Sequence, residues 1–220
     1  AALSLVCLLS VIESKPILLL MWIAGISLGC TYSAPPLRLK SRSWLTFSSL
    51  VLVLAVLPTL FVYYSFSSQL SLLFLLALVG LALTVYGLIV PTETRDYFGD
   101  KTMGIETMTV HLGLLKASLL GITLLIMGSL LMGAPLFLEL VSGQYPFLSV
   151  FLLAIALADF LVLRQYVKLF RLSKEYESSK SFNPAGQKIV DLSANNPKWI
   201  MLVTQTYSIM SIVLLVSKFL

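Results

Sequence analysis

The stretch from Pro91 to Gly113 carries the side chains that are best suited to chemistry. It contains Glu93, Asp96 and Asp100, and in a helix their spacing of i, i+3 and i+7 would place all three carboxylates on one face. Like charges in that arrangement repel one another. A divalent cation such as Mg²⁺, which binds carboxylate, water and phosphate oxygens, would reverse the repulsion. The alternative is an ordinary polar connector whose charges face water.

A second polar segment runs from Tyr32 to Arg42 and reads Tyr-Ser-Ala-Pro-Pro-Leu-Arg-Leu-Lys-Ser-Arg. Its two prolines end the preceding helix. Arg38, Lys40 and Arg42 alternate with other residues, so in an extended segment their side chains would project together. Basic residues here either anchor the chain at the membrane surface or bind an anion. We favour the anchor for Arg42 and leave both interpretations open for Arg38 and Lys40.

These segments belong to a chain that is 58% hydrophobic and only 11% charged, with a mean hydropathy of +0.96. A soluble domain carries about 25% charged residues, so we predict an all-α, polytopic helical membrane bundle in a single domain over residues 1–220. The sequence has seven apolar segments. They cover residues 1–12, 17–33, 44–64, 70–90, about 117–134, about 147–163 and 198–219.

The connectors between these segments follow from turn-forming residues. The acidic stretch is expected to follow the span at 70–90, with Gly99, Gly104 and Gly113 as turn points. Residues 134–146 are expected to form a short connector, and residues 175–197 a polar segment interrupted by Pro, Gly and Asn. Between them, the span at 147–163 is expected to continue out of the membrane as an amphipathic helix over 164–177, whose simplest role is contact with lipid headgroups.

Cationic residues predict the topology. The loops after the second, fourth and sixth spans hold 13 of the 15 lysines and arginines, and the opposite face keeps Lys15 and Lys218. This bias places the basic loops in the cytoplasm. The turn at 32–42 and the acidic stretch therefore emerge on one face. A cluster of carboxylates beside a basic turn is the arrangement that a magnesium-diphosphate site needs.

Two motifs carry a resemblance to a known family. The acidic stretch has the pattern Asp96-x-x-Gly99-Asp100-x-x-x-Gly104-x-x-Thr107-x-x-Val110-x-Leu112-Gly113. It resembles the second aspartate motif of the UbiA superfamily of intramembrane prenyltransferases. Tyr32-Ser-Ala-Pro-Pro-Leu-Arg-Leu-Lys40 resembles the tyrosine–lysine loop of that superfamily, as written in its chlorophyll-synthase-like and archaeal-lipid branches. The family has nine helices and a first aspartate motif that this sequence lacks. The seven apolar segments would correspond to the last seven helices, and we expect residues upstream of Ala1 to be absent.

The resemblance implies an enzyme that transfers an isoprenoid chain from a prenyl diphosphate to a lipophilic acceptor among membrane lipids, with Mg²⁺ as cofactor. By residue match, Asp96 and Asp100 would hold Mg²⁺, and Tyr32 would line the reacting end of the pocket. The residues expected to bind substrate are Lys40, Arg38, Glu93 and Arg95. The form of the tyrosine–lysine loop favours a lipid or tetrapyrrole acceptor over a small benzoate, and no nucleic-acid partner is expected.

Other interpretations remain. The chain could be a non-catalytic member of the family that has lost the first metal site. A transporter is less favoured, because no span carries the paired intramembrane charges that ion coupling usually requires. Asp159 lies inside the sixth apolar segment, and we favour a structural pairing or cap over a substrate role. His111 fits a helix-entry or interface residue better than a catalytic base.

Overall fold

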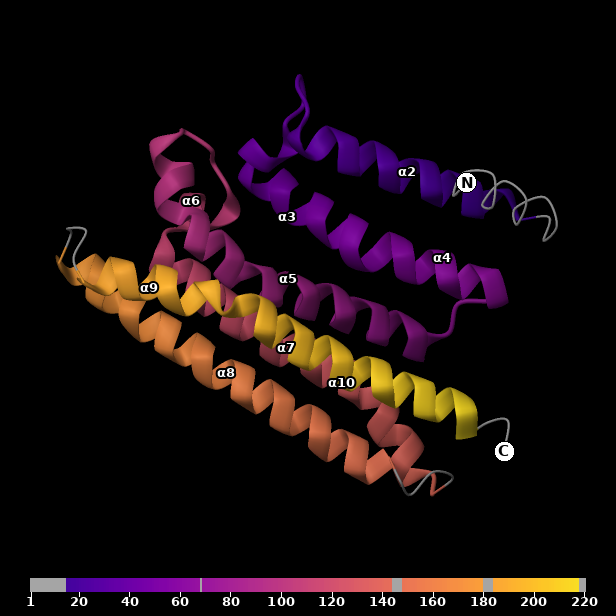
Figure 1. Cartoon of the computed structure of the whole chain (residues 1–220). Coiled ribbons are helices and arrows are strands. Elements are labelled where there is room, and N and C mark those ends of the chain that lie inside the picture. The colour runs from indigo at the N-terminus through magenta and orange to yellow at the C-terminus, as the bar shows by residue number, and fades with distance from the viewer. Residues whose placement is uncertain (1–14, 68, 144–147, 180–183, 218–220) are drawn as a thin grey trace.

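The computed structural model describes residues 15–67, 69–143, 148–179 and 184–217, and long helices dominate these ranges. Figure 1 shows helices that run back and forth between two ends of an elongated bundle. The elements are α2 (Pro16–Ser33), η1 (Leu39–Ser41), α3 (Ser43–Val51), η2 (Leu52–Val56), α4 (Leu57–Phe66), α5 (Leu72–Thr102), α6 (Met108–Leu112), α7 (Leu114–Val141), α8 (Leu148–Ser179), α9 (Pro184–Ala194) and α10 (Asn196–Ser217). The prediction of an all-α fold is confirmed.

Five helices among the described residues are long and apolar enough to cross a membrane. They are Pro16–Ser33, Ser43–Phe66, Leu72–Thr102, Leu114–Leu138 and Ser149–Ser179, and each overlaps most of one predicted span. The first predicted segment, residues 1–12, lies outside the described residues. The last, 198–219, forms α10 as far as Ser217. Many of the long side chains on these helices are exposed, as expected where lipid surrounds the bundle.

Three predicted connectors are wrong in extent, because helices continue through them. Helix α5 runs on to Thr102, so Gly99 lies within a helix and is not a turn point. Helix α7 passes Pro135 and ends only at Val141, since an internal proline removes one hydrogen bond without ending a helix that is packed against neighbours. The polar segment at 175–197 contains α9, whose buried Ala185, Ile189 and Ser193 recur every four residues.

Helices α5 and α7 approach each other so closely that a side chain at Gly80 or Gly128 would collide with backbone atoms of the other helix. Gly80 and Gly87 on α5 and Gly121 and Gly128 on α7 are each seven residues apart. A Cβ atom at Gly80 would lie 2.7 Å from the backbone nitrogen of Met132 on α7. Small residues at a helix contact allow this approach within a membrane. The pair therefore forms the densely packed centre of the bundle and fixes the position of α5.

Pro91 would leave a backbone carbonyl of α5 without a partner, because proline has no N–H group to donate to the residue four positions earlier. That residue is Gly87, and its carbonyl oxygen accepts a hydrogen bond of 2.8 Å from the hydroxyl of Tyr166 on α8. The next carbonyl, of Leu88, accepts one of 2.7 Å from the side-chain amide of Asn196 on α10. Helices α8 and α10 thus hold α5 just before its acidic end.

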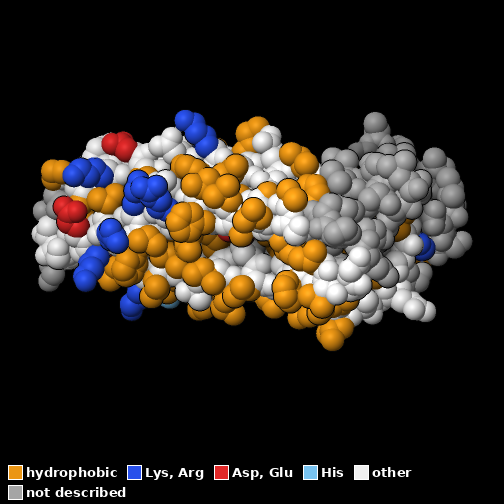
Figure 2. Space-filling view, turned by 90° about the horizontal axis from the view of Figure 1, so that it is seen from below, with side chains coloured by type: hydrophobic (Ala, Val, Ile, Leu, Met, Phe, Trp, Pro, Cys, Tyr) orange, Lys and Arg blue, Asp and Glu red, His pale blue; other side chains and the backbone are white. Residues whose placement is uncertain are grey.

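The two ends of the bundle differ in charge. Figure 2 shows that on one face the lysine and arginine side chains gather towards one end, whereas hydrophobic side chains cover the middle. Figure 1 places the turn between α2 and α3, the end of α5, α6 and the start of α9 at that end. At the other end, Lys15 donates to the carbonyl oxygens of Tyr64 (2.9 Å) and Ser65 (3.2 Å) in the last turn of α4. A cation at that position complements the negative pole of a helix.

Candidate functional site

The basic turn after α2 is compact and not extended, so the predicted alternation of side chains is wrong. Arg38 lies in the left-handed region with φ 38° and ψ 60°, and residues 39–41 form one turn of 3₁₀ helix. The buried hydroxyl of Thr46 on α3 lies 3.0 Å from the carbonyl oxygen of Leu39 and 2.9 Å from that of Lys40. The single hydrogen of this hydroxyl is shared among these carbonyl oxygens, and the contact holds the turn against α3. The prediction of an extended segment did not include a side chain from α3 as partner for these carbonyls.

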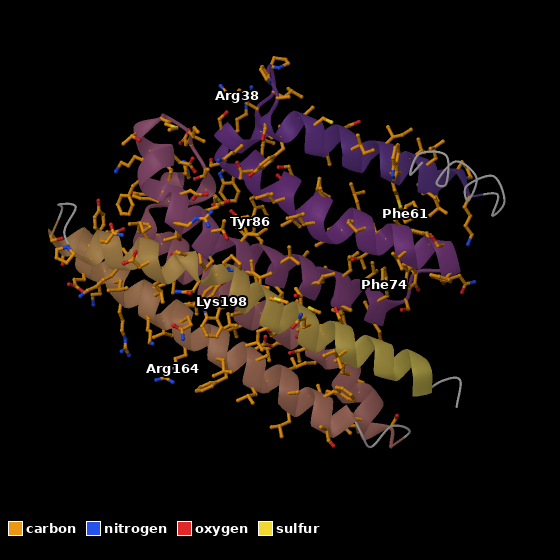
Figure 3. All side chains as sticks on the ribbon, in the orientation of Figure 1. Arg38, Phe61, Phe74, Tyr86, Arg164 and Lys198 are labelled. Atoms are coloured by element: carbon orange, nitrogen blue, oxygen red, sulfur yellow. The ribbon has the colours of Figure 1, made fainter. Side chains whose placement is uncertain are left out.

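A cavity of about 520 Å³ separates this turn from the loop that follows α5. Its lining residues are Tyr32, Ser33, Arg38, Lys40, Ser41, Met103, Gly104 and Ile105. Gly104 adopts a positive φ of 68°, which bends the loop away from the end of α5. Tyr32, Arg38 and Lys40 therefore share one cavity, and Figure 3 shows Arg38 in the turn that joins α2 to α3.

None of Glu93, Asp96 and Asp100 is among the residues that line this cavity, and the acidic end of α5 meets it only through the contact of Asp100 with Lys40. The Nζ atom of Lys40 lies 3.5 Å from Oδ1 of Asp100, whose side chain is only 8% exposed. The turn at 32–42 and the acidic stretch, which lie about 60 residues apart in the chain, are therefore in direct contact.

Glu93 is buried and bonded within the bundle. Its Oε2 atom accepts hydrogen bonds from the backbone N–H (3.2 Å) and the hydroxyl (2.9 Å) of Thr109 on α6. Its Oε1 atom accepts one of 3.3 Å from the hydroxyl of Tyr86, one turn of α5 below Pro91. In this structure the carboxylate therefore ties α6 to α5. Figure 3 shows Tyr86 between α3 and α5, where its ring packs edge-on against Phe47.

Asp96 lies in a different environment. Its Oδ1 atom is 3.0 Å from Nε of the neighbouring Arg95, and both side chains are about two-fifths exposed. Arg95 does not line the cavity. The three predicted carboxylates thus share one side of α5 but differ in contact: Glu93 bonds to α6, Asp96 to its neighbour and Asp100 to the basic turn.

The residues present fit Mg²⁺ only when it is bound together with an anion. Within the described residues there is no group of three His, Cys, Asp or Glu side chains that could hold a metal. Mg²⁺ commonly takes one or two carboxylates and completes its octahedral shell with water and phosphate oxygens. Asp96 and Asp100 can supply those carboxylates, and the cations of the turn can supply sites for phosphate. The protein could thus supply two of the oxygen atoms around Mg²⁺, and a phosphate ligand and water would have to supply the others.

Several residues that build the site were not predicted. Thr46 and Thr109 carry no charge and belong to no motif that reasoning from the sequence would single out, although each is buried and holds a functional segment. The backbones of Arg42 and Glu106 form an isolated parallel bridge, which ties the basic turn to the loop after α5. Non-local pairing of two single residues leaves no pattern in a sequence.

The two remaining polar candidates lie outside the cavity. Nδ1 of His111 is 3.0 Å from Oε1 of Glu106, and both side chains are exposed, in keeping with a helix-entry or interface residue. Asp159 lines a groove between α7 and α8 together with Ser129 and apolar residues. Neither residue is among those that line the cavity.

Comparison with known proteins gives one match. The model of the UbiA prenyltransferase family matches residues 1–176, which include the basic turn, all of α5 and the loop after it. Searches of the curated proteins and of the solved structures found no match.

Proposed function

Because the chain belongs to the UbiA prenyltransferase family and is an integral membrane protein, we propose that it transfers an isoprenoid chain from a prenyl diphosphate to a lipophilic acceptor and releases diphosphate. The observation that carries the proposal is the contact of 3.5 Å between Lys40 and Asp100. It sets a cation that can bind phosphate beside a carboxylate that can bind Mg²⁺, at the edge of one cavity.

The leaving group is the part of the reaction that these residues serve. The bond between the allylic carbon and the diphosphate oxygen breaks, the acceptor forms a bond to that carbon, and the acceptor loses a proton. Arg38 and Lys40 bind the diphosphate oxygens and stabilise the negative charge that develops on them. Asp96 and Asp100 would hold Mg²⁺, which neutralises the same charge. Tyr32 lines the cavity where the carbon would lie.

The pairing of Lys40 with Asp100 also suits a site that changes partners. Without ligand each group neutralises the other, so neither charge is left alone in a place where one side chain is 8% exposed. With ligand bound, Asp100 would be available to hold Mg²⁺ and Lys40 to bind a phosphate oxygen.

The membrane setting accounts for the isoprenoid tail. Each methylene buried in an apolar environment is favourable by about 0.8 kcal/mol, and the bundle exposes apolar side chains on α2 and η2 such as Ile23, Ile26 and Leu54. The excess of cations at the site end supports an active face on the cytoplasmic side. The cations of the turn serve phosphate, so we favour a lipid or tetrapyrrole acceptor over a small benzoate.

Titration with Mg²⁺ and a non-hydrolysable analogue of geranylgeranyl diphosphate tests the site. We expect saturable binding that requires both ligands, and at least a hundredfold weaker binding by a variant with Asp96→Asn and Asp100→Asn. Glu106→Gln with Glu175→Gln is the matched control, because it removes two exposed carboxylates outside this pair. Equal binding by the two double variants would show that the assignment of the site is wrong.

Product formation then tests the reaction. The protein is incubated with geranylgeranyl diphosphate, Mg²⁺ and separate acceptors from the lipid, tetrapyrrole and benzoate classes, and products are identified by mass spectrometry. A prenylated lipid or tetrapyrrole is expected. Binding of the analogue without any product would instead favour a non-catalytic member of the family.

A further inference from the structure

One exposed face of α8 changes its chemistry along its length. Successive residues on this face, three or four positions apart, are Val150, Leu153, Leu157, Phe160, Arg164, Lys168 and Arg171. The four apolar side chains are 57–71% exposed, and the three cations that follow are exposed as well. Figure 3 shows Arg164 on the outer side of α8, away from the other helices. The stripe therefore passes from apolar to cationic between Phe160 and Arg164.

Helix α9 packs beside the cationic part of this stripe and turns it into a groove of about 520 Å³. Lys168 and Arg171 line it from α8, Lys188 lines it from α9, and Asn195 lines it from the residue that follows α9. The half-buried side chains of Leu172 and Leu192 contribute apolar walls between these polar groups. Cations from two separate helices thus converge on one groove, which a simple row of surface charges on one helix would not achieve.

The cations of the groove have no anionic partner of their own. Within the described residues, none of Lys168, Arg171 and Lys188 takes part in an ion pair. Asp191 is the one carboxylate among the lining residues, and its Oδ1 atom accepts a hydrogen bond of 2.9 Å from the side chain of Gln187. The groove therefore offers an excess of positive charge.

We propose that this groove binds the phosphate headgroup of an anionic membrane phospholipid, whose acyl chains lie along the apolar part of the stripe. A phospholipid carries a phosphate directly beside its acyl chains, which is the order of chemistry along α8. At about 1.5 Å per residue, Lys168 lies about 12 Å beyond Phe160, a distance that spans the headgroup layer. Arginine and lysine are the side chains that bind phosphate oxygens most readily.

The proposed lipid site is distinct from the cavity at the basic turn. The two share no lining residue: one is built from α2, its following turn and the loop after α5, and the other from α8 and α9. The proposal does not depend on prenyl transfer, and a lipid in the groove would hold α9 against α8 at the membrane surface.

Native mass spectrometry of the full chain in detergent tests the proposal. Phosphatidylglycerol and phosphatidylcholine with the same acyl chains are titrated separately, and the bound fraction is counted. We expect phosphatidylglycerol to bind at least tenfold more tightly. In a variant with Lys168→Gln, Arg171→Gln and Lys188→Gln, we expect that preference to disappear. The control variant carries Lys116→Gln, Lys174→Gln and Lys198→Gln, which removes the same charge outside the groove and should retain the preference.

The proposal is overturned by equal loss in both triple variants, since binding would then follow net charge alone. Equal binding of the two lipids by the unmodified protein also overturns it. This comparison does not depend on whether a variant folds. A third arm adds inorganic phosphate at 10 mM to the complex with phosphatidylglycerol. Retention of the lipid is expected because its acyl chains contribute to binding, whereas complete displacement would identify the groove as a site for free phosphate.

Discussion

The candidate site has two halves, the acidic end of α5 and the basic turn that contacts it through Lys40 and Asp100, and they are held in very different ways. The acidic half lies on α5, in which thirteen residues are buried, and which is fixed by the glycine contacts with α7. The cationic half follows α2, in which Leu18 is the one buried residue, and leads into a turn held by Thr46. We infer that the carboxylates are a rigid platform, while the cations are positioned more loosely and can close on a diphosphate.

The largest expected effect breaks the rigid half. A Cβ atom at Gly80 would meet backbone atoms of α7 within 2.9 Å, whereas a Cβ atom at Gly29 of α2 would meet nothing within 4 Å. The two variants are Gly80→Val and its control Gly29→Val. Both change the helix propensity by the same amount, so they differ only in the space around the new side chain. We expect Gly80→Val to cost about 3 kcal/mol or more through overpacking. That would lower the unfolding temperature by about 6–12 °C.

The Gly29→Val protein should unfold within about 2 °C of the unmodified one. Thermal unfolding in detergent, followed by circular dichroism and by loss of the monodisperse peak, makes the measurement. Equal stability of the two variants would contradict the close contact of α5 with α7.

The loose half should contribute to binding far more than to stability. We expect Lys40→Gln to weaken binding of the diphosphate analogue at least tenfold, because it removes a cation that the phosphate needs. The same change leaves the carboxylate of Asp100, which is 8% exposed, without its cation; we expect stability to fall by about 1 kcal/mol, because glutamine can still donate to that carboxylate and Lys40 itself is 38% exposed. Analogue titration and thermal unfolding on one preparation measure both quantities.

Lys101→Gln is the control for this prediction. Lys101 follows Asp100 directly, and its Nζ atom lies over the ring of Tyr97 at 5.5 Å from the centroid, outside the cavity. Its replacement should leave analogue binding within about twofold. A loss of stability in Lys40→Gln as large as the loss of binding would mean that the turn is part of the rigid platform.

Much of this comparison could be predicted from the sequence, because it depends on local pattern. Runs of apolar residues identified the spans, and the charge and spacing of Asp96, Asp100 and Lys40 identified the two polar segments and their common end. The length of α5 was underestimated, since the turn residue Gly99 and the acidic side chains suggested a loop. Tertiary packing of that end against α6 and α9 overrides such preferences.

What escaped prediction depends on contacts between distant residues. Tyr166 can donate to the carbonyl of Gly87 because Pro91 has no N–H group to occupy that carbonyl. No residue near Tyr166 in the sequence indicates this hydrogen bond. The left-handed Arg38 and the buried Thr46 are likewise set by the fold around the turn. The same limit applies to the metal: the sequence indicates which carboxylates could hold Mg²⁺, and only binding can test it.

An intermediate loss of stability is expected when the hydrogen bond from α8 to α5 is removed. In Tyr166→Phe the carbonyl of Gly87 loses its donor in a place that water does not reach, which costs about 1–3 kcal/mol. At about 2–4 °C per kcal/mol this is a fall of roughly 2–12 °C in unfolding temperature. Tyr176→Phe is the control, because the hydroxyl of Tyr176 makes no hydrogen bond within the described part of the chain. A Tyr166→Phe protein as stable as this control would show that α5 does not depend on α8 at Pro91.

The smallest expected effect concerns the start of α7, where the acidic half ends. Gly113, with φ 79°, precedes this helix and has no side chain that could cap it. Oε1 of Glu177 on α8 accepts a hydrogen bond of 3.1 Å from the backbone N–H of Leu115 instead. Glu177→Gln keeps an oxygen that can accept this bond but removes the charge that complements the helix dipole, a loss of about 0.3–1 kcal/mol.

The measurement that isolates this charge is thermal unfolding at low and high salt. Glu177→Gln should lower the unfolding temperature by about 1–4 °C at low ionic strength, and the difference should shrink in 1 M salt, where the Debye length is about 3 Å. Glu175→Gln, an exposed carboxylate two residues earlier, should show no such difference. A decrease that persists in 1 M salt would mean that the amide oxygen of glutamine does not replace the carboxylate in this hydrogen bond, and that Glu177 acts through the bond rather than through its charge. The acidic half would then be fixed by geometry alone, from the glycine contacts of α5 to the first turn of α7.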